Sequence, residues 1–308
     1  MDYRIGVDIG GTSVKLGVVS EDLAVAEVSR IPTGKHASAE AIITSIIDGC
    51  RKLQEKYNVV SIGIGSAGRV NPKLGVVEIA GNLPFRGEPI AARVAEATGL
   101  RVSIDNDANV ALIGEAAAGV CKGLSDVVLI TIGTGIGGAV MIDGKIYRGY
   151  NNRAGEFGHF IIKYDHPVRC ECGLYGCFEQ FASGTALINM TQKAVYDEPQ
   201  SILAHLAESG VDGTTAFKAM RSGCETAREV VESYVKLLAV GINSMIMVFQ
   251  PEVLVLSGGV SAEGEELHEL LAPYIIDHAR IGLSSLRGIG GMIGAALLDT
   301  RYGGLYEA

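Results

Sequence analysis

The order of apolar and polar positions along the chain predicts alternating strands and helices. Short apolar runs over residues 4–9 and 14–19 flank a Gly-Gly-Thr tip, which predicts a β-hairpin. Residues 39–56 instead carry apolar side chains at helical spacing, so we expect an amphipathic helix there. Further strands are expected at 59–64, 102–104, 127–131, 137–142 and 253–256. Further helices are expected from about 108 to a C-cap at Gly119, over 225–249 and over 291–300. Residues 190–224 are expected to be helical and polar. Strands alternating with helices indicate an α/β fold.

The opening pattern returns about 125 residues later, which suggests an internal repeat. Residues 129–136 (Leu-Ile-Thr-Ile-Gly-Thr-Gly-Ile) follow the same order of strand, Gly/Thr tip and strand as residues 5–12. We therefore expect two copies of one α/β half. Because no Pro/Ser-rich linker separates them, we expect the halves to meet closely, with a cleft between them.

Composition narrows the class of protein. The chain has 308 residues, of which 48% are hydrophobic and 20% charged, which fits about two globular domains. The net charge is −9 and no Lys/Arg cluster is present, so nucleic acid and anionic membranes are poor partners. We expect no export signal and no membrane span, and hence a cytoplasmic protein.

Three glycine-rich tips follow predicted strands, at Gly10–Thr12, Gly133–Gly138 and Gly258–Gly259. Glycine lets backbone N–H groups face a concavity that accepts phosphate oxygens. None of the tips matches the P-loop pattern. The second tip leads into a strand, whereas a dinucleotide fingerprint opens a helix. The tips therefore predict a phosphate site of another type.

The stretch from Asp105 to Asn109 (Asp-Asn-Asp-Ala-Asn) lies where a strand ends and a helix begins. Phosphoryl transfer to an alcohol needs a carboxylate beside the attacking hydroxyl. Asp and Asn are also the favoured N-cap residues, and capping is the simpler interpretation for Asp105 and Asn109. For Asp107 we favour catalysis, on a family resemblance given below, and a helix N-terminus beside it should also keep its carboxylate ionised.

A cysteine cluster is the most specific pattern in the chain. Cys170, Cys172 and Cys177 fall within eight residues, with His159 eleven positions before the first of them. Three cysteines and one histidine suit a tetrahedral, structural Zn²⁺ in a reducing compartment. Gly173 and Gly176 would allow the tight turns. His166 is a rival ligand that lies nearer to the cysteines but is stiffened by Pro167.

Together these motifs resemble the ROK family (repressors, open reading frames, kinases) of the sugar kinase/actin/Hsp70 superfamily. The resemblance rests on residues 8–12, 131–138, 256–260, 106–109 (Asn-Asp-Ala-Asn) and 154–183, and runs from Asp8 to about Ala296. It implies a two-lobed, actin-like ATPase (ribonuclease H-like) fold with duplicated α/β halves around a cleft. The N-terminal lobe would comprise residues 1–108 and about 297–308, and the C-terminal lobe residues 109–296 with the zinc loop.

The resemblance also implies roles for the residues of these motifs. The first two tips would hold the phosphates of ATP, while Ser257–Gly259 and residues 291–296 would border its adenosine. The implied nucleotide-binding residues are Asp8, Gly10, Gly11, Thr12, Lys15, Gly133, Thr134, Gly135, Gly137, Gly258 and Gly259. Asp107 would be the general base, and the sugar would be bound by Gly68, Asn82, Asn106, Asp107, Glu156, His159 and Glu179. His159, rather than His166, would join Cys170, Cys172 and Cys177 as a zinc ligand.

The implied activity is ATP-dependent phosphorylation of a hexose, with glucose at O6 as the first expectation. Mg²⁺ would accompany ATP, and the enzyme would form a homodimer. N-acetylmannosamine or N-acetylglucosamine as substrate, polyphosphate as donor and a noncatalytic sugar sensor remain alternatives. Phe85–Arg86–Gly87 and Ala67 depart from the family pattern on the sugar side. A repressor would need a DNA-binding helix-turn-helix domain before the kinase-like part. Because the phosphate motif begins at Asp8, we expect no such domain.

Overall fold

The computed structural model describes residues 1–34, 37–165, 168–276, 279–286 and 288–303. The chain divides into two compact units. Unit 1 comprises Met1–Asp126, Ala139–Ala154 and Ser285–Ala308, and unit 2 comprises Val127–Gly138 and Gly155–Ser284. These limits differ from the expected boundaries after residues 108 and 296, because two helices, described below, stay with the first sheet.

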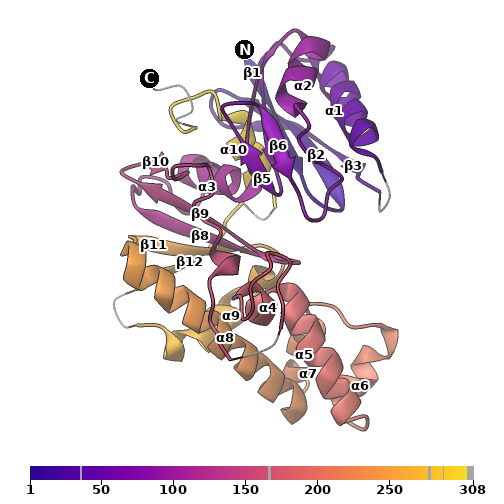
Figure 1. Cartoon of the computed structure of the whole chain (residues 1–308), viewed down its shortest axis with the longest axis vertical. Helices are drawn as coiled ribbons and strands as arrows, with labels where there is room; N and C mark the ends of the chain where they lie inside the picture. Colours follow the sequence, from indigo (N-terminus) through magenta and orange to yellow (C-terminus); the bar gives the residue numbers. More distant parts are fainter. Residues whose placement is uncertain (35–36, 166–167, 277–278, 287, 304–308) are drawn as a thin grey trace. The chain divides into compact units, whose positions relative to one another are not determined.

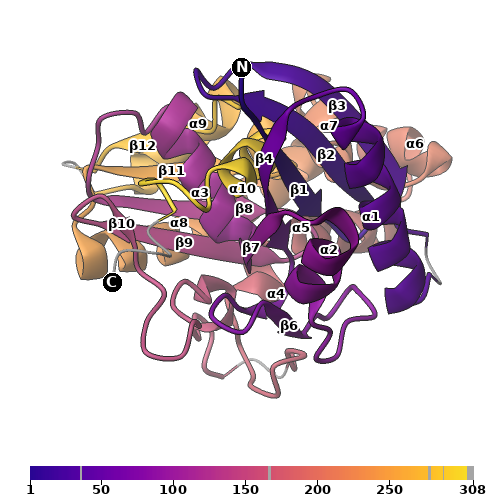
Figure 2. The same cartoon turned by 90° about the horizontal axis from the view of Figure 1, so that it is seen from above.

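Unit 1 contains a five-stranded sheet. Its strands are β1 (Tyr3–Ile9), β2 (Ser13–Ser20), β3 (Val25–Pro32), β4 (Val59–Ser66) and β7 (Arg101–Asn106), in the order β3-β2-β1-β4-β7. Figure 1 labels β1, β2 and β3, and Figure 2 labels all five strands. β1, β2 and β3 are antiparallel neighbours, which confirms the predicted hairpin. β4 and β7 run parallel to β1, so the carboxyl ends of these three strands meet at one edge. A small antiparallel pair, β5 (Arg69–Asn71) and β6 (Val76–Ile79), follows β4.

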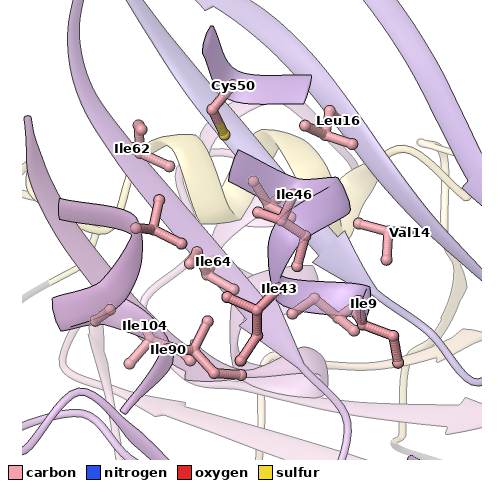
Figure 3. Packing of buried hydrophobic residues seen from close by; sticks show 14 of the residues in the cluster. Ile9, Val14, Leu16, Ile43, Ile46, Cys50, Ile62, Ile64, Ile90 and Ile104 are labelled. Carbon is pink, nitrogen blue, oxygen red and sulfur yellow. The ribbon is translucent and has the colours of Figure 1, made fainter. Parts of the chain in front are cut away.

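The helices α1 (Ala39–Gln54) and α2 (Ile90–Thr98) pack with this sheet in the core of unit 1. Figure 3 shows Ile43, Ile46 and Cys50 of α1 facing strand residues such as Ile9 and Ile64. The apolar spacing of residues 39–56 therefore predicted the buried face of α1. Each such fully buried aliphatic side chain contributes about 1.5–3 kcal/mol relative to an exposed one.

The helices α3 (Asp107–Ala118) and α10 (Gly290–Ala296) pack against each other and on the same sheet (Figure 2). The approach is close because β1 and β4 carry glycines beneath α10. A Cβ added to Gly6 would lie 1.9 Å from the Met292 carbonyl oxygen, and one added to Gly63 would lie 1.7 Å from that of Ala295. α10 ends at Ala296, earlier than expected, and residues 292–296 are buried. This stretch therefore offers no side chain to an adenosine.

The second sheet repeats the order of the first. Its strands are β8 (Val127–Ile132), β9 (Ile136–Ile142), β10 (Lys145–Ile146), β11 (Val253–Ser257) and β12 (Ile281–Leu283), in the order β10-β9-β8-β11-β12. In both sheets the first three strands in chain order lie on one side, and two parallel strands lie on the other. The shared order confirms the duplicated α/β halves.

The other helical segments lie in unit 2. They are η1 (Phe157–His159), α4 (Glu179–Ala182), α5 (Gly184–Asp197), α6 (Ile202–Leu206), η2 (Ala207–Ser209), α7 (Thr215–Arg221), α8 (Glu225–Phe249), η3 (Val260–Glu263), α9 (Glu265–Leu271) and η4 (Ala272–Tyr274). In the described residues, α8 alone is long and apolar enough to cross a membrane by length and composition. More than half of its apolar window is buried, as in a core helix, so this resemblance to a span is weak.

Candidate functional site

In unit 1, the first glycine-rich tip lies between β1 and β2, beside the half-buried carboxylate of Asp8. Asp8, near the end of β1, has Oδ2 3.4 Å from Nζ of Lys15, which also donates a 2.9 Å hydrogen bond to the Gly288 carbonyl. Burial raises the pKa of Asp8, and Lys15 opposes that shift. Gly291 leaves room for the carboxylate, since a Cβ there would lie 3.2 Å from Cγ of Asp8. The expected nucleotide residues Asp8 and Lys15 thus lie together beside the tip.

The expected base is the first residue of α3. Asn106 caps this helix, because its Oδ1 accepts hydrogen bonds from the N–H groups of Ala108 at 2.9 Å and Asn109 at 3.4 Å. Asp107 is half-buried, and its Oδ1 accepts a 2.9 Å bond from the Ala108 N–H. The helix N-terminus favours the charged form of a carboxylate placed there. Asp107 is therefore suited to accept a proton from a bound alcohol.

Asp105 and Asn109 do not cap the helix, so that interpretation is wrong. Asp105 is buried, and its Oδ2 accepts hydrogen bonds from Nε and Nη2 of Arg148 at 2.8 and 2.7 Å. Asn109 donates from Nδ2 to Oδ1 of Asp105 at 2.9 Å. Arg148 continues to the Gly303 carbonyl at 2.8 Å. No local sequence signal links Arg148 to Asp105, which is why sequence reasoning missed this ion pair.

Two expected sugar-side residues lie in loops near these groups. Nδ2 of Asn106 donates to the Gly68 carbonyl at 3.1 Å, so Gly68 lies next to the start of α3. The φ angle of Gly68 is +96°, a conformation that favours glycine. Asn82 is exposed, and a Cβ added to Gly11 would lie 3.5 Å from Cβ of Asn82. Unit 1 thus places Asn82 beside the first tip and Gly68 beside Asn106.

In unit 2, the second and third glycine-rich tips lie side by side. They follow β8 and β11, which are parallel neighbours. Gly258 has a φ angle of +94°, and a Cβ there would lie 2.5 Å from the Ile132 carbonyl oxygen. Gly133, Thr134 and Gly135 form the tip itself, while Gly137 lies within β9. The structure therefore brings Gly258 and Gly259 next to the second tip.

Glu179 contacts the second tip directly. Its Oε2 accepts a 2.8 Å hydrogen bond from the Ile136 N–H. A Cβ added to Gly135 would lie 2.1 Å from the same oxygen, so the carboxylate occupies the space that a side chain would need. Sequence reasoning placed Glu179 on the sugar side only. The structure places one of its oxygens at the second glycine-rich tip.

The cysteine cluster brings four candidate metal ligands together. The ligand atoms of His159, Cys170, Cys172 and Cys177 all lie within 4.8 Å of one another. Nδ1 of His159 is 3.5 Å from Sγ of Cys170, and Sγ of Cys172 is 3.5 Å from Sγ of Cys177. Tetrahedral zinc at ordinary bond lengths would separate such N···S and S···S pairs by about 3.6 and 3.8 Å. The donor set and its spacing therefore fit Zn²⁺.

The backbone of two glycines and the pKa of one thiol in this loop also fit a metal site. Gly173 and Gly176 have φ angles of +93° and +75°, and a Cβ at Gly176 would lie 2.1 Å from the Lys163 carbonyl oxygen. Burial and the neighbouring thiols raise the pKa of Cys177 to about 12. A bound cation would favour the thiolate form of Cys177. The rival ligand His166 lies outside the described residues.

The two ring nitrogens of His159 face different groups. Nδ1 points to the cysteine sulfurs, whereas Nε2 lies 4.0 Å from Oε2 of Glu156. Both side chains are partly exposed, at 36% for His159 and 52% for Glu156. One nitrogen can therefore bind a metal while the other remains close to Glu156 and accessible to a ligand hydroxyl.

Comparisons with known proteins cover both units. A family model described as the ROK family matches residues 4–301. A glucokinase from Streptomyces coelicolor is 35% identical over 270 residues, covering 86% of this chain and 84% of the relative. An N-acetyl-D-glucosamine kinase from Pectobacterium atrosepticum is 31% identical, covering 95% of this chain and 97% of the relative. The crystal structure of a ROK family glucokinase from Streptomyces griseus, in complex with glucose and AMPPNP, matches with a TM-score of 0.85 and 33% identity, covering 96% of this chain and 98% of that one.

Proposed function

The chain belongs to the ROK family and is an ATP-dependent sugar kinase, and we propose that it transfers the γ-phosphoryl group of ATP to O6 of glucose. The observation that carries this proposal is the position of Asp107. It opens α3 at the carboxyl end of β7, beside the capping residue Asn106 and the loop at Gly68. Phosphoryl transfer to an alcohol needs a carboxylate of this kind at the attacking oxygen.

In the proposed reaction, Asp107 accepts the O6 proton as the new bond between O6 and the γ-phosphorus forms. The bond from the γ-phosphorus to the bridging oxygen breaks, and ADP leaves with that oxygen. Asp8 would hold Mg²⁺, which prefers carboxylate oxygen and offsets phosphate charge. The Lys15 ammonium beside Asp8 adds a second positive charge for the phosphates.

The proposed ligands of the sugar hydroxyls are Asn82, Asn106, Glu156, His159 and Glu179. Carboxylates accept from sugar hydroxyls, and a buried polar group left unpaired by the wrong sugar is costly, which gives specificity. His159, Cys170, Cys172 and Cys177 would hold a structural Zn²⁺. Four protein ligands fill its coordination, so the metal would fix the positions of Glu156 and His159 and take no part in the chemistry.

An N-acetylhexosamine is the second candidate substrate. The specific observation in its favour is the 31% identity to an N-acetyl-D-glucosamine kinase over nearly the whole chain. Glucose is preferred because the glucokinase from Streptomyces coelicolor is 35% identical and a glucokinase structure matches with a TM-score of 0.85.

We also propose a cytoplasmic homodimer. The supporting observation for the location is that Cys50, Cys121, Cys170, Cys172, Cys177 and Cys224 are all free thiols. A reducing compartment keeps thiols in that state and available to a metal.

A coupled ADP-release assay tests the function. The purified protein is given Mg-ATP with glucose, N-acetylglucosamine, N-acetylmannosamine, mannose, allose or fructose. In a parallel series polyphosphate replaces ATP, and the sugar phosphate is measured because no ADP is formed. We expect glucose to turn over with a kcat in the ordinary range of about 1–10³ s⁻¹. A higher kcat/KM for an N-acetylhexosamine would replace glucose as the substrate, and no turnover of any sugar would contradict the proposal.

A further inference from the structure

The second glycine-rich tip is held by the start of α5. The Gly184 N–H donates to the Gly133 carbonyl at 2.8 Å, and Oγ1 of Thr185 donates to the Thr134 carbonyl at 2.7 Å. These bonds join residues about 50 positions apart in the chain. Two consecutive carbonyls of the tip are thus drawn to the same helix.

The first tip is held in a corresponding way by Thr33, which follows β3. Oγ1 of Thr33 donates to the Gly11 carbonyl at 2.8 Å, and its N–H donates to the Thr12 carbonyl at 3.1 Å. Thr33 is almost fully buried, with 4% of its surface exposed. In both units, therefore, two consecutive carbonyls of the tip are bound, one of them by a threonine hydroxyl.

The planar trans peptide bond gives these contacts a consequence for anion binding. The C=O of one residue and the N–H of the next point in opposite directions. With the carbonyls of Gly133 and Thr134 held by α5, the N–H groups of Thr134 and Gly135 face away from that helix. Within the described residues, neither of these two amides donates a hydrogen bond to the protein. The same geometry turns the Thr12 N–H away from Thr33.

We propose that Thr185 and Thr33 are positioning residues for phosphate groups of ATP, each acting on the glycine-rich tip of its own unit. Their hydroxyls hold the two tips so that successive backbone N–H groups form anion cradles. Backbone N–H groups turned to one side in this way bind phosphate oxygens. Neither threonine needs to contact the nucleotide. The inference deepens the proposed kinase function and rests on it for the identity of the anion.

The test uses the full-length protein with paired substitutions. Thr185→Val removes the hydroxyl at nearly constant size, and Thr185→Ser keeps it. Thr33→Val and Thr33→Ser form the second pair. Thr98→Val is the matched control, because Oγ1 of Thr98 donates to a backbone carbonyl, that of Val94, within α2 at 2.7 Å. KM for Mg-ATP, KM for the sugar, kcat and the melting temperature are measured, and ADP binding is measured by calorimetry without sugar.

We expect Thr185→Val to raise KM for ATP and Kd for ADP about tenfold, the effect of one lost hydrogen bond at the upper end of its usual range. KM for the sugar and the melting temperature should stay close to wild type, and Thr185→Ser should restore the ATP values. Thr33→Val should weaken nucleotide binding similarly, and Thr98→Val should leave it unchanged.

Unchanged ATP and ADP constants in Thr185→Val would overturn the inference. So would equal increases in KM for ATP and sugar, which would indicate a general structural role. Failure of the kinase proposal is distinguishable, because the wild-type protein would then phosphorylate no sugar. The calorimetric ADP constants would in that case still decide whether the threonines position an anion site.

Discussion

Adjacent residues at the start of α3 have different partners. Asn106 uses its amide oxygen to cap the helix and its amide nitrogen to hold Gly68, so its orientation is fixed from two sides. Asp107 follows it with a half-buried carboxylate at the helix N-terminus. The capping geometry of Asn106 therefore determines where the carboxylate of Asp107 lies.

Replacing Asp107 with Asn should abolish turnover while sugar binding persists. The substitution keeps the size of the side chain but removes the group that accepts the proton, a contribution of about 10²–10⁴ in rate. We expect kcat to fall by at least about 100-fold, with sugar Kd, measured by calorimetry, near the wild-type value. The exposed Asp143→Asn is the control and should keep full activity. Near-normal turnover in Asp107→Asn would exclude its role as the base.

Replacing Glu156 with Gln should affect the sugar rather than the nucleotide. Glu156 lies beside Nε2 of His159 and is half exposed, as a sugar ligand must be. Losing a charged acceptor should raise the sugar KM about 10- to 100-fold and leave KM for ATP within about twofold. Glu171→Gln, an exposed carboxylate between two of the cysteines, should change neither constant. A larger increase in KM for ATP would assign Glu156 to the nucleotide side.

Within unit 2, the loop of the cysteine cluster is held on two sides. Phe178, which follows the last cysteine, stacks on Phe160 with ring centroids 5.3 Å apart. The hydroxyl of the buried Tyr234 donates to the Ala182 carbonyl at 2.8 Å and fixes the end of α4. The loop is thus attached to the core on one side, while Glu179 reaches the second tip on the other.

Removing zinc should destabilise this loop. Elemental analysis should find one zinc per chain, and a chelator should lower the melting temperature by about 2–4 °C for each kcal/mol of lost metal stabilisation. Because the Cys177 thiol has a pKa of about 12 without a metal, zinc binding displaces its proton, and zinc affinity should fall as the pH falls. Cys172→Ser should lose the metal and no longer respond to the chelator. A melting temperature that a chelator leaves unchanged, with no zinc found, would contradict the site.

At the scale of the whole molecule, unit 1 is assembled from three separate stretches of the chain. The C-terminal helix α10 returns to the first sheet and lies over glycines of β1 and β4. Small residues on both sides allow backbone to approach backbone, so the contact has no space for even one methyl group. Residues 290–296 are therefore packed directly on the first sheet.

Replacing Gly63 with Ala should strongly destabilise the protein. The new Cβ would lie 1.7 Å from the Ala295 carbonyl oxygen, so α10 would have to move off the sheet. Overpacking of this kind costs about 1–3 kcal/mol or more, and denaturant unfolding should show a loss of at least about 3 kcal/mol. Gly213→Ala is the control, because its Cβ would meet no atom within 4 Å. Equal stability of the two variants would show that α10 adapts without cost.

The sequence by itself determined the features that depend on short stretches of chain. Alternating apolar runs predicted β1, β2, β4, β7, β8, β9 and β11, and helical spacing predicted α1 and α8. The glycine-rich tips, Asp107 and the spacing of the cysteines were visible for the same reason, since each motif lies within a few neighbouring residues. Short or edge elements such as β3, β10 and β12 were missed, because a few residues of weak alternation carry little signal.

Only the tertiary structure decided which distant residues meet. Arg148 reaches Asp105 across 43 positions, Thr185 reaches Thr134 across 51, and α10 joins the first sheet from the far end of the chain. Each of these contacts joins groups that are distant in the sequence and adjacent in the fold. A buried charge or carbonyl must find its partner wherever the fold provides one. Sequence spacing identifies the groups that react, whereas long-range packing selects the groups that hold them.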